Sequence, residues 1–155
     1  MTLALPPLQR TARAEGTLAW REAGKGVPLV LLHGIGSGSG SWGGQFEAFA
    51  AAHRVIAWDA PGYGGSDPVE GQPTVSDYAR AVAGVLDALK IDRAVFVGHH
   101  TGAIVSVELA AAFPDRVDRV PARGSQPAIE TWVYGDAGAR YVFEDLDGLG
   151  TLRLT

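Results

Sequence analysis

Three short apolar runs in the sequence each end in a glycine-rich stretch, and this repeated order limits the possible folds more than any other feature. The runs are VPLVLL at 27–32, RVIAW at 54–58 and AVFV at 94–97. Each has the length of a strand and is apolar without alternation, which is typical of parallel strands buried on both faces. The sequence therefore predicts a sheet with three parallel strands.

Segments with helical spacing separate these runs. Residues 74–90 carry apolar side chains at i, i+3, i+4 and i+7 steps, and weaker helical patterns cover 41–52 and 103–113. An antiparallel strand is expected at 16–23. Alternation of strands and helices predicts an α/β fold with an open, mostly parallel sheet and helices on both faces.

The pattern changes after residue 120. Pro121 follows Val120 directly, and a proline is not tolerated in a central strand, so we expect the sheet to end there. We predict two parts: the organised segment 1–120 and an irregular tail at 121–155. Within the tail, the aromatic clusters at 132–134 and 141–143 are compatible with a hairpin.

Composition excludes several classes of function. The 155 residues are 46% hydrophobic, which suits one core, and the net charge of -4 offers no basic face for nucleic acid or an anionic membrane. There is no signal segment, no apolar run of membrane-spanning length and no cysteine. We expect a cytoplasmic protein with a small-molecule partner, and the sequence makes no prediction of oligomeric state.

The glycine-rich stretches carry the motifs that matter for function. They read LLHGIGSGSGSW at 31–42, DAPGYGGSDP at 59–68 and VGHHTGA at 97–103. In this order they resemble the α/β-hydrolase superfamily: an HG oxyanion loop, a D-x-x-G-x-G-x-S-type loop and a G-x-S-x-G nucleophile elbow. The resemblance covers 16–120. It implies the N-terminal half of such a domain, apparently truncated, with the strand at 28–32 between the other two.

The same resemblance assigns the candidate site. Gly98 and Gly102 flank the elbow, and His100 stands where the family has its serine nucleophile. The backbone N–H groups of Ile35 and Thr101 would form the oxyanion hole, which does not depend on side-chain identity.

Three neighbouring residues are expected to support the loops. His33 and Gly34 belong to the HG loop, where the imidazole more often braces the loop than transfers protons, and His99 precedes the elbow centre. Adjacent side chains on an elbow diverge and no other ligand pair has suitable spacing, so we predict no metal and no cofactor.

Other prominent side chains have simpler structural interpretations. The loop acids Asp59 and Asp67 are expected to accept hydrogen bonds from backbone amides. Trp42 and Phe46 are expected in the core.

The catalytic triad is incomplete in this sequence. The family takes its acid and its histidine from loops after the nucleophile, whereas all four histidines here lie at 33, 53, 99 and 100. Asp136 resembles the family's acid but has no histidine after it. The resemblance therefore implies a hydrolase of small esters, lactones or related substrates with a defective triad.

Three alternatives to a hydrolase stay open. The first is a non-catalytic small-molecule-binding module, and the second is an inactive fragment with an out-of-frame tail. The third is a Rossmann-type dinucleotide-binding unit built on Gly34, Gly36 and Asp59. The third glycine of the Rossmann fingerprint is replaced by Ser39, which counts against the last of these.

Overall fold

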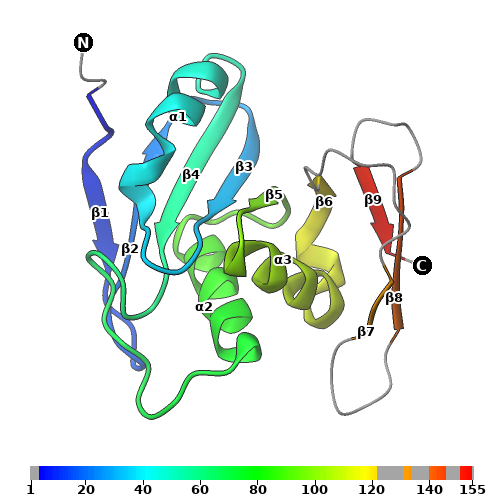
Figure 1. Cartoon of the computed structure of the whole chain (residues 1–155). Helices are drawn as coiled ribbons and strands as arrows, with labels where there is room; N and C mark the ends of the chain where they lie inside the picture. Colours follow the sequence, from blue (N-terminus) through cyan, green and yellow to red (C-terminus); the bar gives the residue numbers. More distant parts are fainter. Residues whose placement is uncertain (1–3, 122–130, 134–139, 146–150, 155) are drawn as a thin grey trace.

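The centre of the molecule is a parallel sheet. The computed structural model describes residues 4–121, 131–133, 140–145 and 151–154. Strand β3 (Val27–Leu32) lies between β4 (His53–Asp59) and β5 (Ala94–Gly98), parallel to both (Figure 1). The three predicted strands and the central place of the first are confirmed.

Antiparallel strands extend one edge of this sheet. Strand β2 (Leu18–Ala23) pairs with β4, and β1 (Leu8–Thr11) pairs with β2. The antiparallel strand expected at 16–23 is therefore confirmed as β2.

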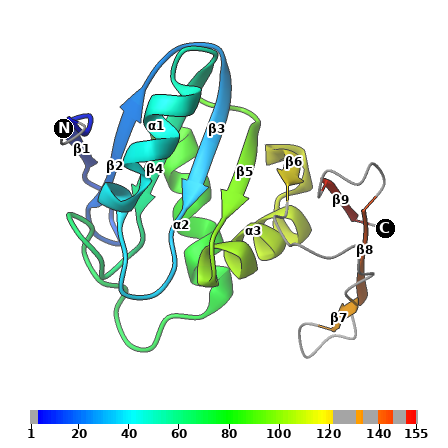
Figure 2. The ribbon, with the colours of Figure 1, turned by 45° about the horizontal axis from the view of Figure 1, so that its top comes forward.

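Helices cover both faces because the side chains of the central strands alternate. Val30 and Leu32 of β3 belong to the core cluster that contains residues of α2 (Val75–Ala88) and α3 (Thr101–Ala112). Leu29 and Leu31 pack instead with Trp42 and Phe46, from the 3-10 helix η1 (Ser39–Trp42) and helix α1 (Gly43–Phe49). Figure 2 shows α1 on one face of the sheet and α2 on the other. A strand buried on both faces has no polar positions, which explains the uninterrupted apolar run.

The sheet does not end before Pro121, and this prediction was wrong. After the 3-10 turn η2 (Pro114–Arg116), β6 (Val117–Pro121) pairs in parallel with β5. Pro121 is the last residue of β6, where a missing N–H removes at most one hydrogen bond from the end of the ladder.

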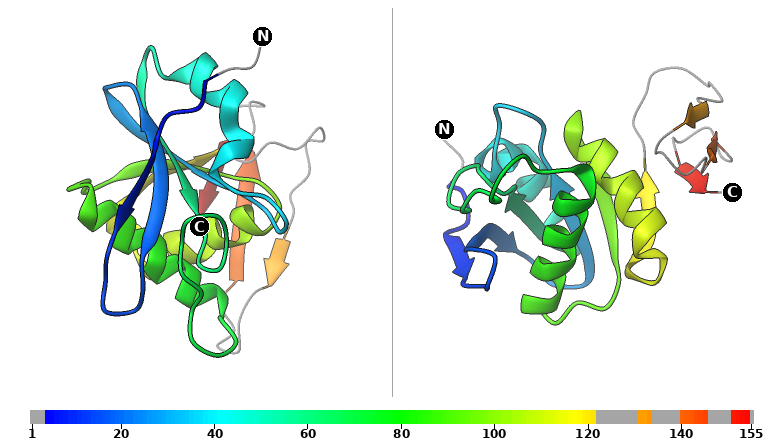
Figure 3. Two further views of the ribbon diagram at one scale, coloured as in Figure 1. Left: turned by 90° about the vertical axis from the view of Figure 1, so that its left-hand side faces the viewer. Right: turned by 90° about the horizontal axis from the view of Figure 1, so that it is seen from below.

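Three further strands continue the order beyond β6, on the side of the sheet away from β1 (Figure 3). They are β7 (Thr131–Val133), β8 (Arg140–Asp145) and β9 (Thr151–Leu154), and β9 pairs with β6. The expected hairpin is present, because β7 and β8 are antiparallel partners. The rest of 121–155, including Asp136, lies outside the described residues, so the prediction of an irregular tail stays a prediction.

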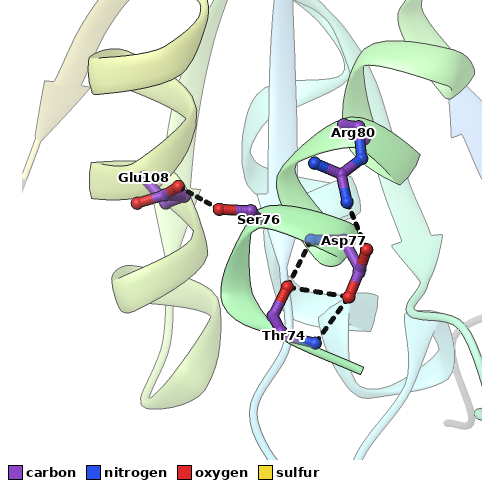
Figure 4. Close-up of polar contacts among 5 residues, drawn as sticks. All are labelled: Thr74, Ser76, Asp77, Arg80 and Glu108. Atoms are coloured by element: carbon purple, nitrogen blue, oxygen red, sulfur yellow. Dashed lines mark hydrogen bonds and ion pairs between the residues drawn. The ribbon is translucent and has the colours of Figure 1, made fainter. Parts of the chain in front are cut away.

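Helix α2 begins at a complete capping box. The Thr74 hydroxyl accepts from the Asp77 N–H, and the Asp77 carboxylate accepts from the Thr74 N–H at 2.7 Å (Figure 4). Arg80 pairs with the same carboxylate, and Ser76 donates to Glu108 of α3 at 2.5 Å. These contacts fix the start of α2 and join it to α3. Within the described part of the chain, no helix is long and apolar enough to cross a membrane.

Candidate active site

His33 lies immediately after β3 and is only 4% exposed. Ala60 donates its N–H to Nε2 at 3.0 Å, so that nitrogen carries no proton, and the protonated Nδ1 donates to the Gly34 carbonyl at 2.8 Å. The Tyr63 ring meets the imidazole edge-on, with centroids 5.1 Å apart. Both ring nitrogens are already hydrogen-bonded, so His33 holds the loop against the end of β4.

His100 lies on a strained turn between β5 and α3. Its backbone has φ 56° and ψ -120°, a region that residues other than glycine rarely occupy. The turn is closed by N–H donation from Gly102 to the His99 carbonyl and from Ala103 to the His100 carbonyl, each at 3.0 Å. The prediction of an unusual turn at His100 is confirmed. Helix α3 consequently begins at Thr101, two residues earlier than expected.

The glycines on either side of this turn have no room for a side chain. A Cβ on Gly102 would overlap the Leu32 carbonyl, and a Cβ on Gly98 would overlap the backbone of Ala103. The first turn of α3 therefore packs directly against the end of β3. Only glycine permits this close approach of backbone to backbone.

The same packing brings the HG loop and the turn together. A Cβ on Gly34 would lie 2.8 Å from the His100 Cβ and 3.2 Å from the His99 carbonyl. The N–H groups of Ile35 and Thr101 belong to these two adjoining segments. Neither N–H has a hydrogen-bond partner among the described residues. Two unused backbone donors are thus available beside His100.

The side chains of His99 and His100 are both exposed. Their ring centroids are 6.5 Å apart, which keeps the ring nitrogens beyond hydrogen-bond distance of each other. Neither ring hydrogen-bonds to another side chain in the part of the chain that the structure describes. The turn thus exposes the His100 imidazole, and no side chain in the described ranges orients it.

The buried carboxylate of Asp59 joins two of the glycine-rich loops. Its Oδ1 accepts from the Ser39 N–H at 2.7 Å, and its Oδ2 accepts from the Gly65 N–H at 2.9 Å. Asp67 accepts from the Thr17 N–H at 2.8 Å. Both acids bond to backbone amides, as the sequence predicts.

Trp42 and Phe46 are only 8% and 5% exposed, so their predicted place in the core is confirmed.

A cleft of about 250 Å³ opens beside the HG loop and His99. The cleft combines an aromatic wall with polar groups, and its lining residues are His33, Ser37, Ser41, Trp42, Gln45 and His99.

Two residues of this site, Gln45 and Tyr63, were not identified from the sequence. Gln45 was missed, although its place three residues after Trp42 puts the two on one side of the helical segment. Tyr63 was also missed, because nothing in DAPGYGGSDP shows that its ring meets His33. No group of three or more potential metal ligands occurs among the described residues.

Comparison with known proteins decides the family. The family model described as "alpha/beta hydrolase fold" matches residues 27–148. The chain belongs to this family. The match includes the HG loop, the loop after β4 and the turn at His100.

Three relatives show the range of activities in the family. The chain is 39% identical to RutD of Azorhizobium caulinodans, provisionally named a carbamate hydrolase, over 78% of this chain and 43% of that protein. It is 40% identical to a 2-hydroxy-6-oxo-6-phenylhexa-2,4-dienoate hydrolase of Burkholderia cepacia, over 64% of this chain and 36% of that one. The structure of Est816, described as an N-acyl homoserine lactone degrading enzyme, is 36% identical with a TM-score of 0.67, covering 70% and 42% of the two chains. The chain thus spans less than half the length of each of these relatives.

Proposed function

We propose that this chain carries the carbonyl-binding half of a hydrolase site for small esters, lactones or related substrates, with an incomplete triad and at most feeble turnover. The observation that carries the proposal is the strained turn at His100 pressed against Gly34 of the HG loop. A family that hydrolyses acyl compounds uses such a turn to expose its nucleophile. The relatives' names support a carbonyl substrate, since they include a carbamate hydrolase and a lactone-degrading enzyme.

The Ile35 and Thr101 amides act in this proposal as the oxyanion hole. When a nucleophile attacks a carbonyl carbon, negative charge develops on the carbonyl oxygen, and preorganised N–H donors stabilise that charge. Both amides lack a partner within the described residues, so they are free for this role. The cleft lined by Trp42 and Gln45 would hold the adjacent part of a small substrate.

His100 provides an imidazole in place of the serine hydroxyl. A neutral imidazole nitrogen can attack the carbonyl carbon of an activated phenyl ester. The phenolate then leaves with the electron pair of the broken C–O bond, and the imidazole loses its ring proton to water. A second water then hydrolyses the acyl-imidazole to the carboxylic acid and restores the ring. Among the described residues no acid orients His100, and both nitrogens of His33 are occupied. We therefore expect slow turnover.

Hydrolysis of 4-nitrophenyl acetate tests this proposal. We expect the wild-type chain to turn over well below about one per second, and His100→Ser to be no faster because serine has no base to take its proton. His100→Ala measures the contribution of the imidazole, with His53→Ala as a control histidine away from the site. Turnover of about one per second or faster that is lost in His100→Ala would overturn the incomplete-triad proposal.

A non-catalytic binding module is the second candidate. The observation that favours it is the pair of unpartnered amides beside a cleft, in the absence of an oriented base among the described residues. Calorimetric titration with a small methyl ketone, which cannot be hydrolysed, distinguishes the two. Saturable ketone binding without measurable ester turnover favours the binder.

A further inference from the structure

The HG loop is attached at both of its ends to the end of β4. At its start, the Ala60 N–H donates to Nε2 of His33 at 3.0 Å. At its other end, the Ser39 N–H donates to Oδ1 of Asp59 at 2.7 Å. Ile35 lies between these two attachments, and it is 68% exposed, so its own side chain contributes little to fixing its backbone. Between the anchors, the Ser37 N–H donates to the Gly34 carbonyl at 3.2 Å and closes a turn around Ile35. The two anchors hold this turn in place, so the position of the Ile35 N–H depends on them.

We propose that Asp59 is a positioning residue for the carbonyl site, which sets the orientation of the Ile35 amide by holding Ser39. The inference rests on the proposed function, because it gives the Ile35 N–H a role in binding the carbonyl oxygen. Asp59 itself touches no substrate. It is only 3% exposed and lies beneath the loop.

The carboxylate is suited to this task because it serves two loops at once. Its second oxygen accepts from Gly65 at 2.9 Å, in the loop after β4. Gly64 has φ 50° and packs so tightly against the carboxylate that a side chain there would overlap it. Tyr63 of the same loop contacts the His33 ring. The two anchors of the HG loop are thus coupled through the segment 59–65.

An uncharged isostere cannot reproduce this arrangement. Both partners of Asp59 are N–H donors, so both carboxylate oxygens must accept. Asparagine offers one accepting oxygen and one donating NH₂ group, and the NH₂ would face one of the two backbone donors. Asp59→Asn therefore breaks one bond while keeping the volume of the side chain.

Two substitutions disturb the hold of Asp59 on Ser39. Asp59→Asn removes one of the two acceptors, whereas Ser39→Pro removes the Ser39 donor and places a ring methylene against Oδ1. Proline suits the first position of η1, and the preceding Gly38 is extended, with φ -177° and ψ -177°. Asp67→Asn is the matched control, because Asp67 also accepts from a backbone N–H, that of Thr17, but outside the HG loop.

The experiment measures ester hydrolysis and the Ile35 amide in the full chain. We expect kcat for 4-nitrophenyl acetate to fall by about 10- to 100-fold in Asp59→Asn and Ser39→Pro, because a misplaced donor weakens binding of the transition state. KM should change by less than about twofold, since the bond to oxygen strengthens only in the transition state. The double variant should be no worse than the more impaired single variant. Asp67→Asn should leave both constants within about twofold of the wild type.

Nuclear magnetic resonance of the Ile35 N–H separates this inference from the proposed function. Asp59→Asn and Ser39→Pro should shift the Ile35 cross-peak, whereas Asp67→Asn should not. Absence of ester hydrolysis in the wild type would favour the binding module over a hydrolase, and the Ile35 cross-peak would then decide whether Asp59 positions this amide. If Ser39→Pro folds and leaves the Ile35 cross-peak unchanged, or moves it without lowering a measurable kcat, the inference is overturned.

Discussion

Helices α2 and α3 pack against each other, yet they begin in opposite ways. Helix α2 is preceded by Thr74, whose hydroxyl and Asp77 partner complete a capping box (Figure 4). Helix α3 is preceded by His100, with φ 56° and no hydrogen bond from its side chain to the helix. The capping box satisfies two backbone donors at the start of α2, whereas the start of α3 carries strain at His100 and has no side-chain cap. Strain of this kind, when tolerated by its surroundings, is concentrated at functional sites.

The largest effect is expected from replacing the second residue of each helix with alanine. Gly102→Ala in α3 should lower the free energy of unfolding by about 3 kcal/mol or more, because the Cβ overlaps the Leu32 carbonyl and the backbone must move. Ser76→Ala in α2 removes only the hydrogen bond to Glu108 and should cost about 1 kcal/mol or less. Urea unfolding of both variants provides the measurement. Equal losses would mean that the start of α3 is no more constrained than that of α2.

Replacing each of the two N-cap residues should change the free energy of unfolding by smaller amounts and in opposite directions. Thr74→Ala loses the cap and should lower the free energy of unfolding by about 1 kcal/mol. His100→Gly should raise it by about 0.5–1 kcal/mol, because glycine adopts a positive φ without steric strain, although its freedom in the unfolded chain offsets part of the gain. His100→Ala keeps the strain and is the control. A loss of stability in His100→Gly would contradict the view that the turn is strained.

The same contrast explains what could be predicted from the sequence. Apolar runs such as 27–32 identify the central strands because burial on both faces leaves a direct pattern in the residues. The turn at His100 was also predictable, because VGHHTGA resembles the family's elbow, in which small residues such as Gly98 and Gly102 flank a strained centre. Strand β6 was missed because Pro121 argues against a strand when its terminal position is not known.

The connections among loops were not predictable in the same way. The bond from Ser39 to Asp59 joins residues 20 apart, and its existence depends on how β3 and β4 align. The sequence indicated that Asp59 would bond to a backbone amide but not to which one. Local pattern therefore reveals each loop, whereas the tertiary register determines how the loops hold one another.

The smallest expected effect concerns pH at the start of α2. The N–H of Thr74, followed by its hydroxyl and Arg80, lowers the pKa of the Asp77 carboxyl below its ordinary value of 3.8. A carboxyl whose pKa is lower in the folded protein stabilises the fold above its ordinary pKa, and that contribution is lost as the pH falls through the lowered value. The stability difference between wild type and Asp77→Asn should therefore shrink between pH 5 and about pH 3, and it should be smaller than the effect of Thr74→Ala because the pair is exposed and screened. His100→Ala, at the start of α3, should show no such convergence over this range, because no carboxylate caps that helix among the described residues. Thermal unfolding of the three proteins at each pH makes the comparison, and a wild-type advantage over Asp77→Asn that grows on acidification would show that the carboxylate does not stabilise the start of α2 as the capping box implies.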